Sequence, residues 1–167
     1  LEMSFVEQQD VFDAVEPVIK GVFEEFSEKV VDANFLHISF ADSMLKYGND
    51  KPDLRIPFEI CDVTDIFRRS DFSIFAKNIE KGAVVRAVPG PKCGSRAIAD
   101  RMNSWAQSEG APGMGYIIYG EGGEARGPVA KALGAGKAEA IRAIAGVGAG
   151  DAVFFACAPA DDAASLA

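Results

Sequence analysis

Apolar residues recur every three or four positions near the start of the chain, with acids and lysines between them. Val11, Val18 and Val22 follow this spacing, which is typical of an amphipathic helix over residues 8–31. Pro17 lies inside the segment and removes one backbone hydrogen bond, so a kink is expected there. The apolar face of this helix needs a partner, and the sequence that follows does not offer an obvious one.

The segments on either side of this helix are less regular. Residues 1–6 are predicted to form the end of a strand. Residues 32–57 are irregular apart from a short helix predicted at 40–47, which runs into a stretch rich in turn-forming residues. A change of pattern between residues 53 and 67 predicts a domain boundary there.

From residue 71 onward, strand-like and helical patterns alternate. Runs of β-branched and aromatic residues predict strands at 72–78, 83–88, 114–119 and 151–158. Capping and apolar spacing predict helices at 95–108, 128–133, 137–145 and 160–167. Trp105 is expected in the core. This order predicts the α+β class, with one sheet and helices packed on one of its faces.

Composition supports a folded domain without a membrane segment. The 167 residues are 49% hydrophobic and 25% charged, which is enough apolar material for one core. No apolar run approaches the roughly 20 residues of a membrane helix, and no signal peptide is evident, so we expect a cytoplasmic protein with no membrane partner. The start without Met suggests a piece of a longer protein. Cys61, Cys93 and Cys157 are expected to be free thiols in a reducing compartment.

Negative charge is concentrated at the start of the chain. Nine acids and two lysines fall within residues 1–40, so nearly all of the formal charge of −8 lies there. Phosphate binding requires basic groups, which argues against a nucleic-acid surface in this part. The nearly neutral remainder neither favours nor excludes a local RNA contact.

The familiar catalytic and metal-binding patterns are incomplete. His37 is the only histidine, so a Ser-His-Asp triad or a zinc site has no further candidate. The stretch at 90–95 lacks the Gly-Lys-Ser/Thr of a phosphate loop and contains Pro91, with Pro89 directly before it. The aspartates between residues 50 and 65 do not match the spacing of a calcium loop, and no metal site is expected.

One polar stretch stands out, namely Tyr47-Gly-Asn-Asp-Lys-Pro-Asp-Leu-Arg55. Its two cations, Lys51 and Arg55, lie four residues apart and are interleaved with Asp50 and Asp53. From the residues alone, a salt-bridged connection between two packed units is favoured over a phosphate-contact site.

This stretch closely resembles the Tyr-Gly-Ser-Asp-Lys-Pro-Asp-Leu-Arg signature of bacterial-type aspartyl-tRNA synthetases, with Asn49 in place of Ser. Leu1-Glu-Met-Ser-Phe5 resembles the chain that leaves motif 2 of these class II enzymes. Gly127-Pro-Val-Ala-Lys131 and Gly150-Asp-Ala-Val-Phe-Phe155 are similar to motifs of the GAD domain, which the family inserts between motifs 2 and 3. That domain also occurs in tRNA-dependent amidotransferase subunits.

The resemblance implies a fold and a parent activity. Residues 1–60 would be a remnant of the class II catalytic domain, and residues 61–167 a two-layer, DCoH-like GAD domain with helices on one face of an antiparallel sheet. The parent would be a homodimer that uses ATP and Mg²⁺ to attach aspartate to tRNA through an aspartyl-adenylate. Motif 3, the motif 2 loop, the aspartate-binding stretch and the anticodon-binding barrel are not in this sequence, so we expect the chain alone to be inactive and without cofactors.

The resemblance also gives candidate site residues and partners. Glu2 is expected to line the parent's aspartate and adenylate pocket, and no residue of the chain is expected to be catalytic. Candidate contacts to tRNA or between domains are Asp50, Lys51, Asp53, Arg55, Arg86, Lys92, Arg96 and Arg126. The expected partners are the rest of the catalytic domain and tRNA, whose binding by this piece alone would be weak or absent.

Two other interpretations stay open. The domain could be a protein-interaction or spacer module of the synthetase, or the equivalent insert of an amidotransferase subunit. The signature at residues 47–55 and the motif 2 exit argue against the amidotransferase. Whether the parent charges only tRNA-Asp or also tRNA-Asn is not decided by this sequence.

Overall fold

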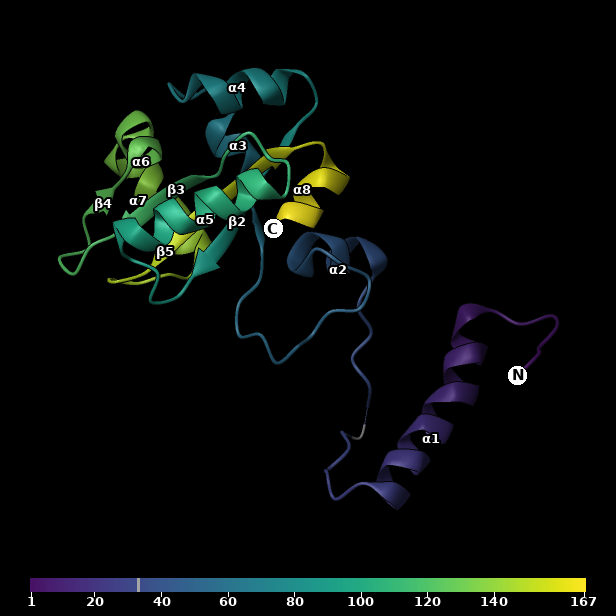
Figure 1. Cartoon of the computed structure of the whole chain (residues 1–167). Helices are drawn as coiled ribbons and strands as arrows, with labels where there is room; N and C mark the ends of the chain where they lie inside the picture. Colours follow the sequence, from purple (N-terminus) through teal and green to yellow (C-terminus); the bar gives the residue numbers. More distant parts are fainter. Residues whose placement is uncertain (33) are drawn as a thin grey trace. The chain divides into compact units, whose positions relative to one another are not determined.

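The computed structural model describes residues 1–32 and 34–167 and divides the chain into two compact units, residues 1–38 and residues 39–167 (Figure 1). The first unit contains one long helix, and the second contains a sheet and seven further helices. The boundary expected at residue 60 is of another kind, because it separates two domains of the family that the sequence resembles. Compactness does not test that boundary, so it stays a prediction.

Helix α1 (Gln8–Phe26) forms where the apolar spacing predicts a helix, but it is shorter. It begins with a capping box, in which the backbone amide of Glu7 donates to Asp10 Oδ2 at 2.8 Å. Pro17 is accommodated within the helix. The helix ends before residue 31 because Ser27 has an extended backbone and its Oγ accepts from the amide of Lys29, a local bond that competes with further helical turns.

The strand expected at residues 1–6 is wrong. The backbone there is irregular, and Phe5 has a φ of 58°. A strand needs a neighbour to pair its backbone N–H and C=O groups, and among the described residues of the first unit no strand is present to supply one.

The second unit is built on a five-stranded antiparallel sheet in the order β1-β2-β5-β3-β4. Its strands are β1 (Cys61–Asp62), β2 (Val84–Gly90), β3 (Gly115–Tyr119), β4 (Ala125–Arg126) and β5 (Ala152–Ala158). Strand β5 is central and pairs with β2 over its whole length, with Phe155 opposite Ala87. The α+β class and the strands expected near residues 83–88, 114–119 and 151–158 are confirmed.

Seven helices accompany the sheet. They are α2 (Phe40–Tyr47), α3 (Thr64–Phe67), α4 (Ser73–Glu80), α5 (Arg96–Ser108), α6 (Pro128–Leu133), α7 (Ala135–Ala145) and α8 (Ala160–Leu166). The predicted helices are confirmed, and Ser95 caps α5 by accepting from the amide of Ile98. None of the helices in the described ranges is long and apolar enough to cross a bilayer.

The strand predicted at residues 72–78 is wrong, because α4 occupies this segment. Phe72, Phe75 and Ile79 recur at helical spacing, and Phe75 and Ile79 are buried in the main core. This burial outweighs the strand preference of a short aromatic run.

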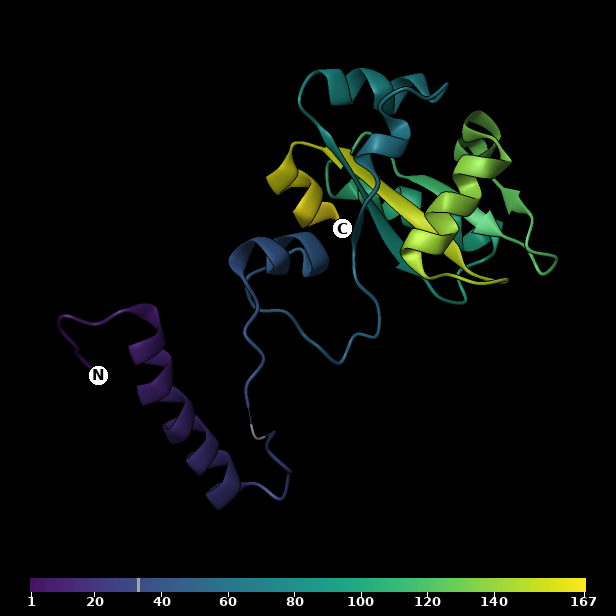
Figure 2. The ribbon, with the colours of Figure 1, turned by 180° about the vertical axis from the view of Figure 1, so that it is seen from behind.

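Helices cover both faces of the sheet, so the prediction of one covered face is also wrong (Figures 1 and 2). On β5, Val153 and Phe155 pack into the core formed with α3, α4, α6 and α7, whereas Ala152 and Phe154 point to the opposite face and pack with Ala99 of α5. Successive side chains of a strand alternate between faces, so a strand that is apolar at every position is buried on both sides.

Trp105 is not in the core, contrary to expectation. Helix α5 turns Ala99 and Ala106 toward the sheet, and both are buried. Trp105 lies one position from Ala106, about 100° around the helix, and is 43% exposed.

Phe155 supplies a test of the core. It is 1% exposed, and its ring centroid lies 5.3 Å from that of Phe67 and 6.5 Å from that of Phe75. Phe155→Ala is expected to lower the free energy of unfolding by about 3–5 kcal/mol in urea denaturation, because it leaves a cavity between α3, α4 and the sheet. Ile74→Ala, at a side chain that is 64% exposed, should cost less than about 1 kcal/mol. Equal losses would contradict this assignment of the core.

Candidate functional site

The loop between α2 and β1, residues 48–60, begins in a conformation that only glycine fits. Gly48 follows the last residue of α2 with a φ of 72°, and a Cβ at this position would lie 2.5 Å from the carbonyl oxygen of Ala164 in α8. The other end of the loop is fixed as well, because the amide of Ile60 donates to the carbonyl of Lys46 at 2.8 Å. The loop is therefore closed at its base and held against α8.

Asn49 shapes the first turn of the loop. Its Oδ1 accepts from the amide of Lys51 at 2.8 Å, and its Nδ2 donates to the carbonyl of Tyr47 at 3.0 Å. The buried Ser43 of α2 donates its Oγ–H to the carbonyl of Asn49 at 2.7 Å. A Ser side chain, which the resembling family has at this position, can also accept from an amide two residues ahead, so the replacement preserves the turn.

Two ion pairs between near neighbours order the charged side chains of the loop. Lys51 Nζ lies 3.0 Å from Asp50 Oδ2. Asp53 Oδ1 accepts from the backbone amide and the Nε of Arg55, and Arg55 Nη2 lies 2.5 Å from Asp53 Oδ2. The Arg55 side chain is 90% exposed, so its pairing adds little stability but presets where the guanidinium lies.

The pKa values of these acids respond to the same contacts. Hydrogen bonds from the Arg55 side chain and then from its amide lower the pKa of Asp53 from 3.8 to about 2. The hydrogen bond from Lys51 likewise lowers the pKa of Asp50. Both carboxylates are therefore charged at any physiological pH, and their charges are balanced by Lys51 and Arg55.

A cavity of about 190 Å³ opens beside this loop. Ile56, Phe58 and Ile60 give it apolar walls, and Lys46 and Asp53 stand among its polar lining. The hydrogen bond with Glu59, 3.1 Å away, raises the pKa of Lys46. Such a lining can receive a group with an apolar body and a polar edge.

Arg86, one of the predicted contact residues, plays a structural part. It lies opposite Asp62 in the β1–β2 pairing and forms an ion pair with it. The Arg86 side chain is only 14% exposed, so it braces the edge of the sheet and offers little surface to a ligand.

The other predicted cations are spread over the unit. Arg96 Nε lies 3.1 Å from Asp100 Oδ1 in α5, and Arg126 of β4 pairs with Glu124. Lys92 donates its backbone amide to Asp151 Oδ1 at 2.8 Å. Strand β4 and strand β1 are opposite edges of the sheet. The structure therefore brings together Asp50, Lys51, Asp53 and Arg55 but does not unite the remaining cations with them.

Glu2 lies exposed in the irregular start of the first unit. Nothing in this unit tests its expected role in a substrate pocket. Sequence reasoning missed Ser43, Lys46 and Glu59, whose contacts with the loop join positions six to thirteen residues apart. No local sequence pattern predicts contacts between residues that far apart.

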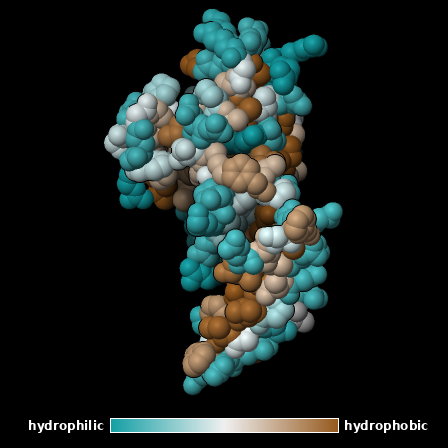
Figure 3. Space-filling view, turned by 90° about the vertical axis from the view of Figure 1, so that its right-hand side faces the viewer, coloured by the Kyte–Doolittle hydropathy of each residue, from teal (hydrophilic) through white to brown (hydrophobic). Residues whose placement is uncertain are grey.

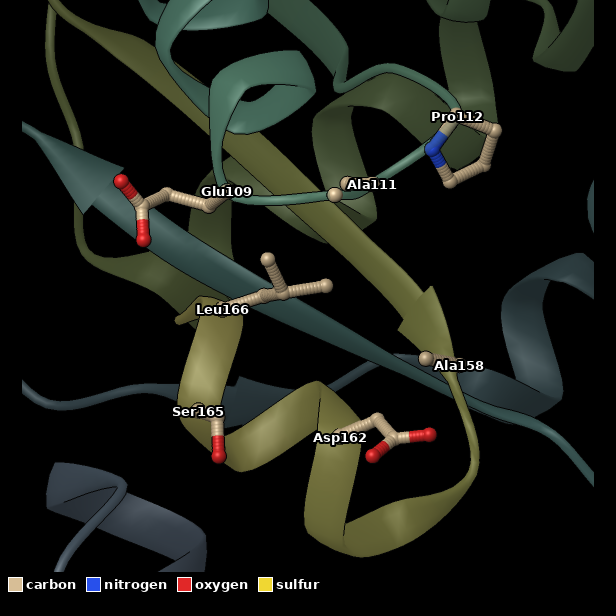
Figure 4. Close-up of a pocket in the computed structure, with 8 residues that line it drawn as sticks. Glu109, Ala111, Pro112, Ala158, Asp162, Ser165 and Leu166 are labelled. Atoms are coloured by element: carbon tan, nitrogen blue, oxygen red, sulfur yellow. The ribbon is translucent and has the colours of Figure 1, made fainter.

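A second hollow, of about 370 Å³, lies between the end of α5 and α8 (Figure 4). Leu166 and Ala158 give it apolar surface, and its eight lining residues include the carboxylates of Glu109 and Asp162 but no cation. This charge does not suit a phosphate. Within residues 1–32 and 34–167, no three His, Cys, Asp or Glu side chains are arranged to hold a metal ion.

Comparison with known families gives the class of protein. Residues 1–144 match the family model of the class II tRNA synthetases (D, K and N). The chain therefore belongs to the class II tRNA synthetases.

Individual relatives show which class II synthetases the chain is similar to. The chain is 58% identical over 157 residues to an aspartate–tRNA(Asp/Asn) ligase of Rhodopseudomonas palustris, covering 93% of this chain and 27% of the relative. It is 52% identical over 170 residues to the ligase of the same name from Rickettsia bellii, covering 100% of this chain and 28% of the relative. The resemblance to aspartyl-tRNA synthetases is thus confirmed, and the chain spans little more than a quarter of the length of these relatives.

Gly48 provides a test of the closure of the loop. Gly48→Ala is expected to destabilise the protein because it combines a left-handed backbone with a clash against the Ala164 carbonyl. Gly82→Ala is the matched control, since Gly82 also has a positive φ of 95° but has no atom within 4 Å of the added Cβ. Urea denaturation should show a loss at Gly48 that exceeds the loss at Gly82 by about 1–3 kcal/mol. Equal losses of stability in the two variants would show that the contact with α8 does not contribute to the destabilisation.

Asp53 provides a test of the ion pair. In Arg55→Gln the pKa of Asp53 should rise from about 2 toward its ordinary 3.8, measured by NMR titration of the carboxyl carbon. Because the pairing lowers the folded-state pKa, its contribution to stability is present above pH 3.8 and is lost as pH falls toward 2. An unchanged Asp53 titration in Arg55→Gln would show that the pair does not form in solution.

Proposed function

We propose that this chain is an internal part of an aspartate–tRNA ligase, and that the parent attaches aspartate to tRNA. The observation that carries the proposal is the identity of 52–59% with aspartate–tRNA(Asp/Asn) ligases over nearly the whole chain. The ordered loop at residues 47–55 supports it, since Gly48, Asn49 and the Asp53–Arg55 pair each have a structural reason in that signature.

In this proposal the chain joins two parts of the parent. Residues 1–60 come from the class II catalytic domain, and residues 61–167 are the GAD insertion domain. The exposed apolar face of α1 supports the first assignment, because α1 has no buried residue, and Val18, Val22 and Phe26 are among its exposed apolar side chains (Figure 3). Covering a face of this kind stabilises a protein by about 1.5–3 kcal/mol per large side chain, and the rest of the catalytic domain is the proposed cover.

The chemistry belongs to the parent. The aspartate carboxylate attacks the α-phosphorus of ATP and releases pyrophosphate, and a terminal ribose hydroxyl of tRNA then takes the aspartyl group and releases AMP. We assign ATP and Mg²⁺ to other parts of the parent, with Glu2 as the one candidate pocket residue of this chain. A homodimeric parent and a cytoplasmic location belong to the same proposal.

The insertion domain has an accessory part in this scheme, with two candidate forms. Contact with the acceptor arm of tRNA is the first. A spacer or protein-interaction module is the second. The ion pairs of Lys51, Arg55 and Arg96 lower the charge that these three residues offer to phosphates, so they weigh against a phosphate contact at these residues. The match of residues 1–144 to class II synthetases weighs against the insert of an amidotransferase subunit.

Pyrophosphate exchange tests the assignment of the chemistry. The full-length parent should show aspartate-dependent exchange of pyrophosphate into ATP, whereas the purified chain of 167 residues should show none above a sample without aspartate. Turnover by the chain alone would contradict its proposed inactivity. A full-length parent that cannot charge tRNA with aspartate would contradict the proposed function itself.

A further inference from the structure

Helix α5 carries an exposed aromatic ring without an aromatic or cationic partner. Trp105 is the one tryptophan of the chain and is 43% exposed, although it lies on a helix that packs on the sheet. Within the described ranges, no aromatic ring or guanidinium stacks on the indole, whereas Arg142 does lie over the ring of Tyr119, 5.6 Å from its centroid. Part of the Trp105 side chain is thus exposed to solvent, where a ligand can reach it.

The surroundings of Trp105 are polar. Arg101 and Ser108 are exposed and lie four and three residues from Trp105, which places them next to it on the helix surface. Ser104, which directly precedes Trp105, is exposed as well. Within the part of the chain that the structure describes, Arg101 has no carboxylate partner, in contrast to Arg96, which pairs with Asp100. Arg101 lies one helical turn, about 6 Å, before Trp105.

This arrangement fits a nucleic-acid base better than a protein surface. An apolar protein interface needs contiguous apolar area, and the other large exposed apolar residues of the second unit lie outside α5. They are Phe40, Leu54, Ile56, Ile74 and Ile144. A single planar ring beside an unpaired guanidinium instead suits one stacked base and the phosphate next to it.

We propose that Trp105 and Arg101 form an RNA contact, in which an unpaired base stacks on the indole and the guanidinium binds the adjacent phosphate. This inference rests on the proposed function, because the RNA it names is the tRNA of the parent enzyme. It identifies α5, on the face of the sheet opposite α6 and α7, as the surface that meets the RNA (Figures 1 and 2).

The single tryptophan makes the contact directly measurable. An RNA hairpin with four unpaired 3′ nucleotides, added to the whole chain at low salt, should quench the fluorescence of Trp105. The same hairpin with a blunt end should quench it much less, because it offers no free base to stack. Quenching should weaken with added salt, as expected for a phosphate contact.

Variants separate the two parts of the contact when affinity is measured by the anisotropy of a labelled hairpin. Trp105→Ala should weaken binding about fivefold or more, since stacking is lost. Arg101→Gln should weaken binding similarly. It should also lower the number of phosphate contacts, taken from the dependence of the affinity on salt, by about one. Lys77→Gln removes the same charge from an exposed position of α4, which packs on the opposite face, and should leave both unchanged.

The outcomes decide between partners. Binding of the hairpin without quenching, or equal losses in Arg101→Gln and Lys77→Gln, would overturn the proposal. A parent enzyme in which Trp105→Ala leaves the affinity for tRNA unchanged would also overturn it, since the indole would then take no part in binding the RNA. None of these results would affect aspartate charging by the parent, so failure of this inference is distinct from failure of the proposed function.

Discussion

The packing of both faces of β5 is the constraint on which the second unit depends. Val153 and Phe155 need one layer of helices, while Ala152 and Phe154 need another. Because β5 is also hydrogen-bonded to β2 on one side and β3 on the other, it has no free edge and no free face over most of its length. The helices lie where they do because both apolar faces of β5 have to be buried.

Elements with a clear apolar period could be predicted from the sequence. The helix at Phe40–Tyr47 and the helix at Pro128–Leu133 lie at the predicted residues, because caps and glycines mark their ends. The segment around Phe75 was harder, since a short run of aromatic residues fits a strand as well as a helix. Its identity is decided by burial against Phe67 and the sheet, which is a tertiary effect.

The candidate site shows the same division. The loop contains two ion pairs between near neighbours, Asp50 with Lys51 and Asp53 with Arg55. The interleaved charges of these residues predict such pairs from the sequence. The pairing of Lys46 with Glu59 spans thirteen residues, and no local signal reveals it. The apolar stripe of its helix predicts Trp105 in the core, but Ala106, the next position around the helix, is the residue that is buried against the sheet.

The contact of Gly48 with Ala164 has an architectural consequence. It joins the beginning of the second unit to its last helix, and Ala167 lines the same cavity as Lys46. Segments that lie far apart in the sequence are therefore held together, so that the fold of the second unit closes between its first helix and its last.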